Sequence, residues 1–151
     1  MIQSWQNHFM QAALGQAKTA MEMGEVPVGA VVVRENSILA AAHNETAIRK
    51  DPTAHAEMLA IRIACAKLQT THLVDCDVYV TLEPCAMCGQ AIAFSRIARV
   101  IYAASDPKGG GIEHGARIFN QPTCHHKPEI FSGIEADAAG MLLKDFFKQK
   151  R

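Results

Sequence analysis

The chain has 151 residues with 15 basic and 15 acidic side chains, and 49% of its residues are hydrophobic. That length can bury a core as a single domain over residues 1–151, and the zero net charge gives no global sign of a nucleic-acid partner. No apolar run approaches the roughly 20 residues of a membrane span, and the N-terminus lacks the pattern of a secretory signal, so we expect a cytoplasmic protein without a membrane partner.

The first half of the chain predicts a helix, a hairpin and a second helix. Apolar side chains recur at near-helical spacing over residues 8–23. Residues 26–44 are typical of two strands joined by a turn at residues 35–37. A second helix is expected over residues 54–68, with Thr53 as its candidate N-cap.

The second half of the chain alternates between strands and helices. It predicts a strand at residues 77–82, a helix at 83–97 with Pro84 in its first turn, a strand at 98–104, an edge strand at 129–133 and an amphipathic helix at 135–151. Strands that alternate with helices after an opening hairpin indicate a mixed sheet between layers of helices. The expected fold class is therefore α/β.

Three side chains in this layout suit a metal. Five cysteines, an odd number in a chain without an export signal, favour metal, redox or core roles over disulfides. Cys85 and Cys88 lie one turn apart at the predicted start of a helix, where the partial positive charge of the helix end favours thiolates. His55 lies at the predicted start of another helix beside the same sheet. One imidazole and two thiolates suit Zn²⁺ in a tetrahedron.

Glu57 extends this group into a catalytic pattern. Three protein ligands leave a fourth position for water, which is typical of a catalytic zinc site. Glu57 follows His55 by two residues and could take a proton from that water and deliver it to a leaving group. Taken alone, the Cys85-x-x-Cys88 pair could equally be a redox pair, and a His-x-Glu pair arises often by chance. In this order and combination, they favour a catalytic zinc.

Several segments of the chain resemble those of one enzyme family. They are, in order, "EVPVGAVVV", "DPTAHAE", "YVTLEPCAMC", "SRIARVIYAASDPKGG" and "LLKDFF". They are similar to segments of the bacterial tRNA-specific adenosine deaminases, a branch of the cytidine deaminase-like zinc deaminases. The resemblance extends from about residue 8 to residue 149. It implies a three-layer α/β/α fold around a central mixed five-stranded sheet.

The resemblance also implies a reaction. Members of that family hydrolyse adenosine to inosine at position 34, the wobble position of a tRNA anticodon, and release ammonia. By the same resemblance, His55, Cys85 and Cys88 would hold one Zn²⁺ per subunit and Glu57 would shuttle protons. The expected partners are the tRNA anticodon stem-loop and a second copy of the chain, because the family forms homodimers with composite active sites.

Substrate contacts are carried over by position. They are Asn44 at the flipped base, the Ala56 amide near the attacked carbon, Asp106 and Lys108 beside the flanking nucleotides, and Phe147 with Phe146 near the anticodon loop. Basic side chains concentrated near the end of the chain would serve phosphates. The two phenylalanines could instead pack the last helix onto the sheet. Residues 45–50 differ from the forms expected beside the anticodon in that family.

Two other functions stay open. The protein could deaminate a free base or nucleoside, or it could be a zinc-stabilised RNA-binding module without catalysis, with Cys124 or His125 as a fourth ligand. Two smaller features are also ambiguous. Glu83 could steady a ligand or a backbone amide, or it could be a solvated carboxylate at a strand end. The glycines at 109–111 are typical of a flexible loop.

Overall fold

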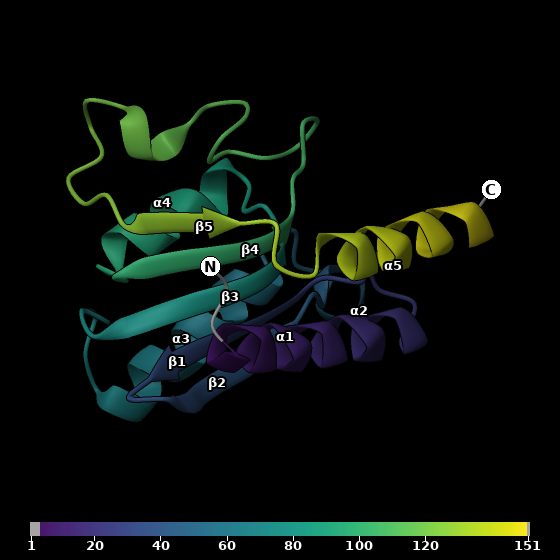
Figure 1. Ribbon diagram of the computed structural model, residues 1–151, viewed down its shortest axis with the longest axis horizontal. Helices are drawn as coiled ribbons and strands as arrows, with labels where there is room; N and C mark the ends of the chain where they lie inside the picture. The colour runs from purple at the N-terminus through teal and green to yellow at the C-terminus, as the bar shows by residue number, and fades with distance from the viewer. Residues whose placement is uncertain (1–3, 151) are drawn as a thin grey trace.

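A central five-stranded sheet lies between two layers of helices (Figure 1). This computed structural model describes residues 4–150. Along the chain the elements are α1 (Ser4–Glu22), β1 (Gly29–Arg34), β2 (Ser37–His43), α2 (Thr46–Arg49), α3 (Ala56–Leu68), β3 (Cys76–Leu82), α4 (Ala86–Phe94), β4 (Arg99–Ala104), the 3₁₀-helix η1 (Ile118–Asn120), β5 (Glu129–Ser132) and α5 (Ala136–Gln149). The expected three-layer α/β fold is confirmed.

The sheet is mixed, with the strand order β2-β1-β3-β4-β5. Strand β1 pairs antiparallel with both β2 and β3, whereas β3, β4 and β5 run parallel. Helix α4 connects the parallel strands β3 and β4, because neighbouring parallel strands need a long crossover connection between them. Strand β5 lies at an edge, as the sequence predicts.

The side chains of the central strands alternate between two hydrophobic cores. In β1, Val31 packs on the side of α1, whereas Val32 packs on the side of α3. In β3, Tyr79 and Val80 divide in the same way. This period of two is the normal consequence of the strand pleat. In Figure 1, α1 and α5 lie in front of the sheet, and α3 and α4 lie behind it.

The hairpin turn lies at the predicted place but is one residue shorter than the predicted span of 35–37. Glu35 and Asn36 both have positive φ, 52° and 59°, and Ser37 begins β2 opposite Arg34. Two consecutive residues in this conformation match the twist of a two-residue hairpin. The short helix α2 was not predicted, because its four residues are too few to show a periodicity.

The strand directions bring several chain segments together at one end of the sheet, the end at which β3 and β4 finish. The carboxyl ends of the parallel strands β3 and β4 lie side by side. Because β1 is antiparallel to β3, the start of β1 and the end of β2 lie at that same end of the sheet. Sites in open α/β sheets form at the carboxyl ends of parallel strands. Within residues 4–150, no helix combines the length and the apolar character that a membrane span requires.

Candidate active site

His55 lies where α3 begins. Its backbone is extended, with φ −73° and ψ 153°, and it is the N-cap residue of the helix, without a capping side-chain hydrogen bond. The prediction that Thr53 caps this helix is wrong. The Thr53 amide and hydroxyl both donate to an Asp51 carboxylate oxygen, at 2.8 and 2.7 Å. The hydroxyl therefore stabilises a local turn that lies two residues before the N-cap of the helix.

Cys85 and Cys88 occupy the start of α4. Cys85 is the N-cap residue, also in an extended conformation, and Cys88 lies within the first turn of the helix. Pro84 precedes the cap rather than occupying the first turn, which corrects the sequence-based prediction. One extended residue therefore separates the proline from the helix. Cys88 is fully buried, whereas Cys85 and His55 are half-buried.

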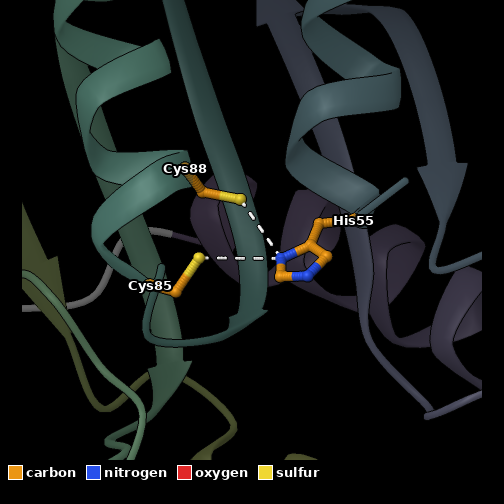
Figure 2. Close-up of side chains that lie close together, drawn as sticks. All are labelled: His55, Cys85 and Cys88. Carbon is orange, nitrogen blue, oxygen red and sulfur yellow. Dashed lines mark hydrogen bonds between the residues drawn. The ribbon is translucent and has the colours of Figure 1, made fainter. Parts of the chain in front are cut away.

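The three side chains converge on one point between the two helix starts (Figure 2). The His55 Nδ1 atom lies 3.6 Å from Cys85 Sγ and 3.5 Å from Cys88 Sγ. Their three donor atoms all lie within 4.8 Å of one another. A tetrahedral zinc with ordinary bond lengths would separate nitrogen and sulfur ligands by about 3.5 Å. The arrangement therefore fits a metal ion of this size and ligand preference.

Electrostatics at the cluster favour a thiolate. The pKa of Cys85 is lowered to about 4, chiefly by a hydrogen bond with Cys88 and, against the opposing effect of burial, by one with His55. The hydrogen bond with Cys85 raises the pKa of His55, and burial acts in the opposite direction. Cys85 thus favours the thiolate, the form that binds metal, whereas the same hydrogen bond and burial raise the pKa of Cys88.

Glu57 lies in the first turn of α3 and is almost completely buried. Burial is the main cause that raises its pKa to about 7. A carboxyl group in such an environment exchanges a proton readily near neutral pH. Two residues after His55, it stands at the same helix start as the cluster.

A pocket of about 310 Å³ opens beside the cluster. Six of the predicted site residues line it: Asn44, His55, Ala56, Glu57, Cys85 and Asp106, the last from the loop that follows β4. Asn44 is buried and donates a long hydrogen bond, 3.4 Å, to the Thr46 hydroxyl. The pocket thus combines the candidate ligands, a buried carboxyl group and a buried amide.

Of the other predicted residues, Cys88 belongs to the metal cluster without lining the pocket, and the rest lie away from the pocket lining. Lys108 is exposed on the loop that carries Asp106. Phe147 is 49% exposed on α5, whereas its neighbour Phe146 is buried. One of the two phenylalanines therefore packs in the core, which was one of the two expected roles. In Figure 1 the end of α5 projects beyond the strands.

Sequence reasoning missed part of the pocket wall. Val26, Val28, Thr46 and Leu82 also line the cavity. None belongs to the metal motif, and Glu83 and Gly109 complete the lining. Val26 and Val28 reach the site because β1 is antiparallel to β3, and Thr46 reaches it from the start of α2. Their one signal is position, since Val26 and Val28 directly precede a strand and Leu82 ends one.

The alternative metal ligands point elsewhere. The Cys124 thiol donates to the His126 carbonyl at 3.2 Å, and the His126 ring contacts the Ile97 carbonyl at 2.6 Å. Across residues 4–150, His55, Cys85 and Cys88 form the one group of three metal-ligating side chains. A fourth ligand from Cys124 or His125 is not brought to it.

Known proteins resemble this chain over almost all of its length. Residues 3–151 match the MafB19-like deaminase family. A tRNA-specific adenosine deaminase of Agrobacterium fabrum is 49% identical over 144 residues, which cover 95% of each chain. The chain belongs to the tRNA-specific adenosine deaminase family. A tRNA-specific adenosine deaminase of Bacillus subtilis is 41% identical over 143 residues, covering 95% of this chain and 89% of the relative.

Solved structures agree with this family membership. One from a study of A-to-I editing by tRNA:A34 deaminases at the wobble position superposes with a TM-score of 0.89. It is 49% identical and covers 90% of this chain and 99% of the other. A guanine deaminase of Bacillus subtilis is 41% identical with a TM-score of 0.63, but the match covers 65% of this chain and 63% of that one. The tRNA deaminase therefore matches over more of both chains.

Proposed function

We propose that this protein is a zinc-dependent hydrolase that converts adenosine to inosine at position 34 of a tRNA anticodon and releases ammonia. The observation that carries the proposal is the meeting of His55, Cys85 and Cys88 at a pocket lined also by Glu57. The tRNA substrate is supported by relatives that are 49% and 48% identical across 95% of their length and are named tRNA-specific adenosine deaminases.

The donor set indicates zinc as the metal. A nitrogen and two sulfur atoms at 3.5 and 3.6 Å suit a tetrahedral ion with borderline-soft preferences, and calcium or magnesium would require oxygen ligands. We assign His55, Cys85 and Cys88 as its ligands, one ion per chain. When bound, zinc would activate a water molecule for attack at neutral pH.

Glu57 then has the position and environment of a proton carrier. Its carboxylate oxygen accepts a proton from the attacking water, and the same group donates a proton to the departing amino group of adenine. The burial that raises its pKa to about 7 keeps both protonation states accessible. Because Glu57 does not join the metal cluster, it can move protons without leaving a ligand position.

The remaining pocket residues would bind the base. The Asn44 amide is buried at the wall and has a hydroxyl 3.4 Å away, which leaves hydrogen-bonding capacity for a polar edge of adenine. Apolar side chains such as Val28 and Leu82 would cover the face of the ring. A base can reach this pocket only if it leaves the stack of the anticodon loop, as enzymes that act on bases require.

The proposal is tested by moving the adenosine within the anticodon loop. The zinc-loaded protein is incubated with an anticodon stem-loop that carries its one loop adenosine at position 34, and in parallel with a loop of the same composition that carries it at position 35. Nucleoside mass spectrometry should find inosine in the first RNA only. No inosine in either RNA, or equal amounts in both, would reject the assignment.

A free-base deaminase is the second candidate, because a guanine deaminase shares 41% identity with 65% of the chain. The two candidates make different predictions for α5. An RNA substrate extends beyond the pocket and can contact exposed side chains on neighbouring elements, whereas a free base cannot. The test therefore compares one exposed and one buried side chain on α5.

Phe147→Ala is expected to raise the KM for the stem-loop about 10-fold and to change the melting temperature little. Stacking of a base on an aromatic ring contributes about 1–3 kcal/mol, and Phe147 is half exposed. Its matched control is Phe146→Ala, which removes a buried ring and should cost about 3 kcal/mol of folding stability. Steady-state kinetics and thermal melts distinguish the two. An unchanged KM for Phe147→Ala would show that this face of α5 does not contact RNA.

Three further features stay predictions drawn from the family resemblance and the composition. They are a homodimer with composite sites, a cytoplasmic location and a single domain over residues 1–151. Sedimentation velocity on the zinc-loaded protein measures the first directly.

A further inference from the structure

A buried carboxylate lies between the metal cluster and the loop that follows β4. Glu83 directly follows the last residue of β3, and its side chain is fully buried. The alternative of a solvated carboxylate at the strand end is therefore wrong. The immediate neighbour of Glu83 along the chain is Pro84, followed by Cys85. The mechanism proposed above gives Glu83 no role.

The Glu83 carboxylate accepts hydrogen bonds from four backbone amides and contacts one imidazole. The Asp106 amide donates to Oε1 at 3.0 Å, and the amides of Ile112, Glu113 and His114 donate to Oε2 at 3.2, 3.0 and 3.1 Å. The His114 Nδ1 atom lies 2.8 Å from Oε1. All of these partners belong to one loop, residues 106–114. A single side chain thus satisfies the polar backbone at both ends of that loop.

The glycines of the loop allow this close approach. A Cβ atom on Gly110 would lie 2.4 Å from Glu83 Oε2, and one on Gly111 would lie 2.5 Å from the Ala86 amide nitrogen. The Gly111 amide also donates to the Pro84 carbonyl at 2.8 Å. The expected loop is present at residues 109–111, and Gly110 and Gly111 are buried within it. The loop backbone packs directly against the carboxylate and the first turn of α4.

The front of the same loop lines the pocket. Asp106 contributes to the cavity wall, and its Oδ1 atom accepts the amides of Lys108 and Gly109 at 3.3 and 3.0 Å. Lys108 is exposed beside it. The loop thus presents the Asp106 carboxylate at the pocket wall and carries the exposed Lys108 two residues further on, and Glu83 holds the backbone from which both extend.

We propose that Glu83 is a positioning residue that fixes residues 106–114 at the pocket rim and thereby determines how the nucleotides flanking the target adenosine bind. This inference rests on the proposed RNA substrate. Glu83 itself lines the pocket, but its two oxygens are both engaged by residues 106–114, so its effect is exerted through the loop. Its two oxygens face five donors, so glutamine, which keeps the shape but has one acceptor oxygen, would turn an amide NH₂ toward backbone N–H groups.

The first measurement does not depend on activity. Amide hydrogen exchange in the zinc-loaded Glu83→Gln protein should accelerate about 10-fold or more at residues 106 and 112–114, with the sheet amides unchanged. Glu129→Gln, which alters an exposed carboxylate at the start of β5, is the matched control. Unchanged exchange in the loop of Glu83→Gln would overturn the proposal.

The second measurement separates binding from chemistry. Glu83→Gln should raise the KM for the stem-loop by about 10- to 100-fold, the loss typical of hydrogen bonds to a charged group, with kcat within about threefold and one zinc per chain. Gly110→Ala should show the same split, because its Cβ displaces the same contact from the other side. A loss of zinc, or a fall in kcat at unchanged KM, would assign Glu83 to the metal site instead and overturn the proposal.

The double variant Glu83→Gln/Lys108→Ala tests whether Glu83 affects RNA binding through the loop that carries Lys108. If Glu83 acts through the loop, the effects of the two changes on KM should not add. Additive effects would show that Glu83 acts by another path. Failure of the proposed function is a distinct result, since the unaltered protein would then form no inosine while the exchange measurement still reports on the loop.

Discussion

Glu57→Gln is expected to lower the rate of inosine formation at least about 100-fold while zinc stays bound, because it removes the proton carrier and keeps the shape of the side chain. Glu57 is buried in the pocket wall in hydrogen-bond contact with Cys88, and it is not one of the three metal-ligating side chains. Single-turnover kinetics on the stem-loop, with zinc measured by mass spectrometry on the same sample, separates proton transfer from metal loss.

The matched control for Glu57 is Glu22→Gln. Glu22 is exposed at the end of α1, so this change removes one negative charge without touching the pocket. It should leave rate and zinc content unchanged. Loss of zinc from Glu57→Gln would contradict the assignment, since it would make Glu57 a ligand or a support of one.

Cys88→Ser is expected to abolish both zinc binding and activity. The Cys88 side chain is fully buried, and its sulfur lies 3.5 Å from His55 Nδ1, so the change removes one of the three ligand atoms of the cluster. A hydroxyl is a poor substitute for a thiolate at zinc, and binding at such sites falls steeply when one ligand is lost. The zinc content should drop from one ion per chain to less than about a tenth, with no detectable inosine.

Two further cysteine variants make this result specific. Cys65→Ser changes a half-buried cysteine on α3 outside the cluster and should retain zinc. Cys124→Ser tests the non-catalytic module, which needs a fourth protein ligand. Zinc lost from Cys124→Ser, together with a cobalt spectrum of four protein ligands, would favour that module over an enzyme.

The sequence predicted what depends on local pattern. Residues 77–82 identified β3 by their pattern, whereas β1 is an apolar run, because adjacent side chains such as Val31 and Val32 enter different cores. The candidate ligands followed from residue type and spacing, since Cys85 and Cys88 are neighbours on one turn of α4. The family resemblance supplied the mixed five-stranded sheet between two layers of helices, and the strand order comes from the structure.

What the sequence did not predict depends on contacts between distant residues. Glu83 is ambiguous in the sequence because its partners lie 23 and 31 residues further along, at Asp106 and His114. The glycines at 109–111 are typical of flexibility until the carboxylate that they pack against is known. Helix α2 is held by Glu25, whose oxygens accept two of its amides at 3.1 and 2.7 Å, and no local pattern records that contact.

The substrate class is the central claim, and one competition reaction tests it most directly. The zinc-loaded protein receives equal concentrations of an adenosine-34 stem-loop, free guanine, free cytosine and free adenosine, and mass spectrometry follows every product together with ammonia. We expect each ammonia released to be matched by one inosine at position 34 of the RNA, with the free compounds unchanged. Ammonia matched by xanthine or uracil, with the RNA intact, would contradict the account and make this chain a free-base deaminase.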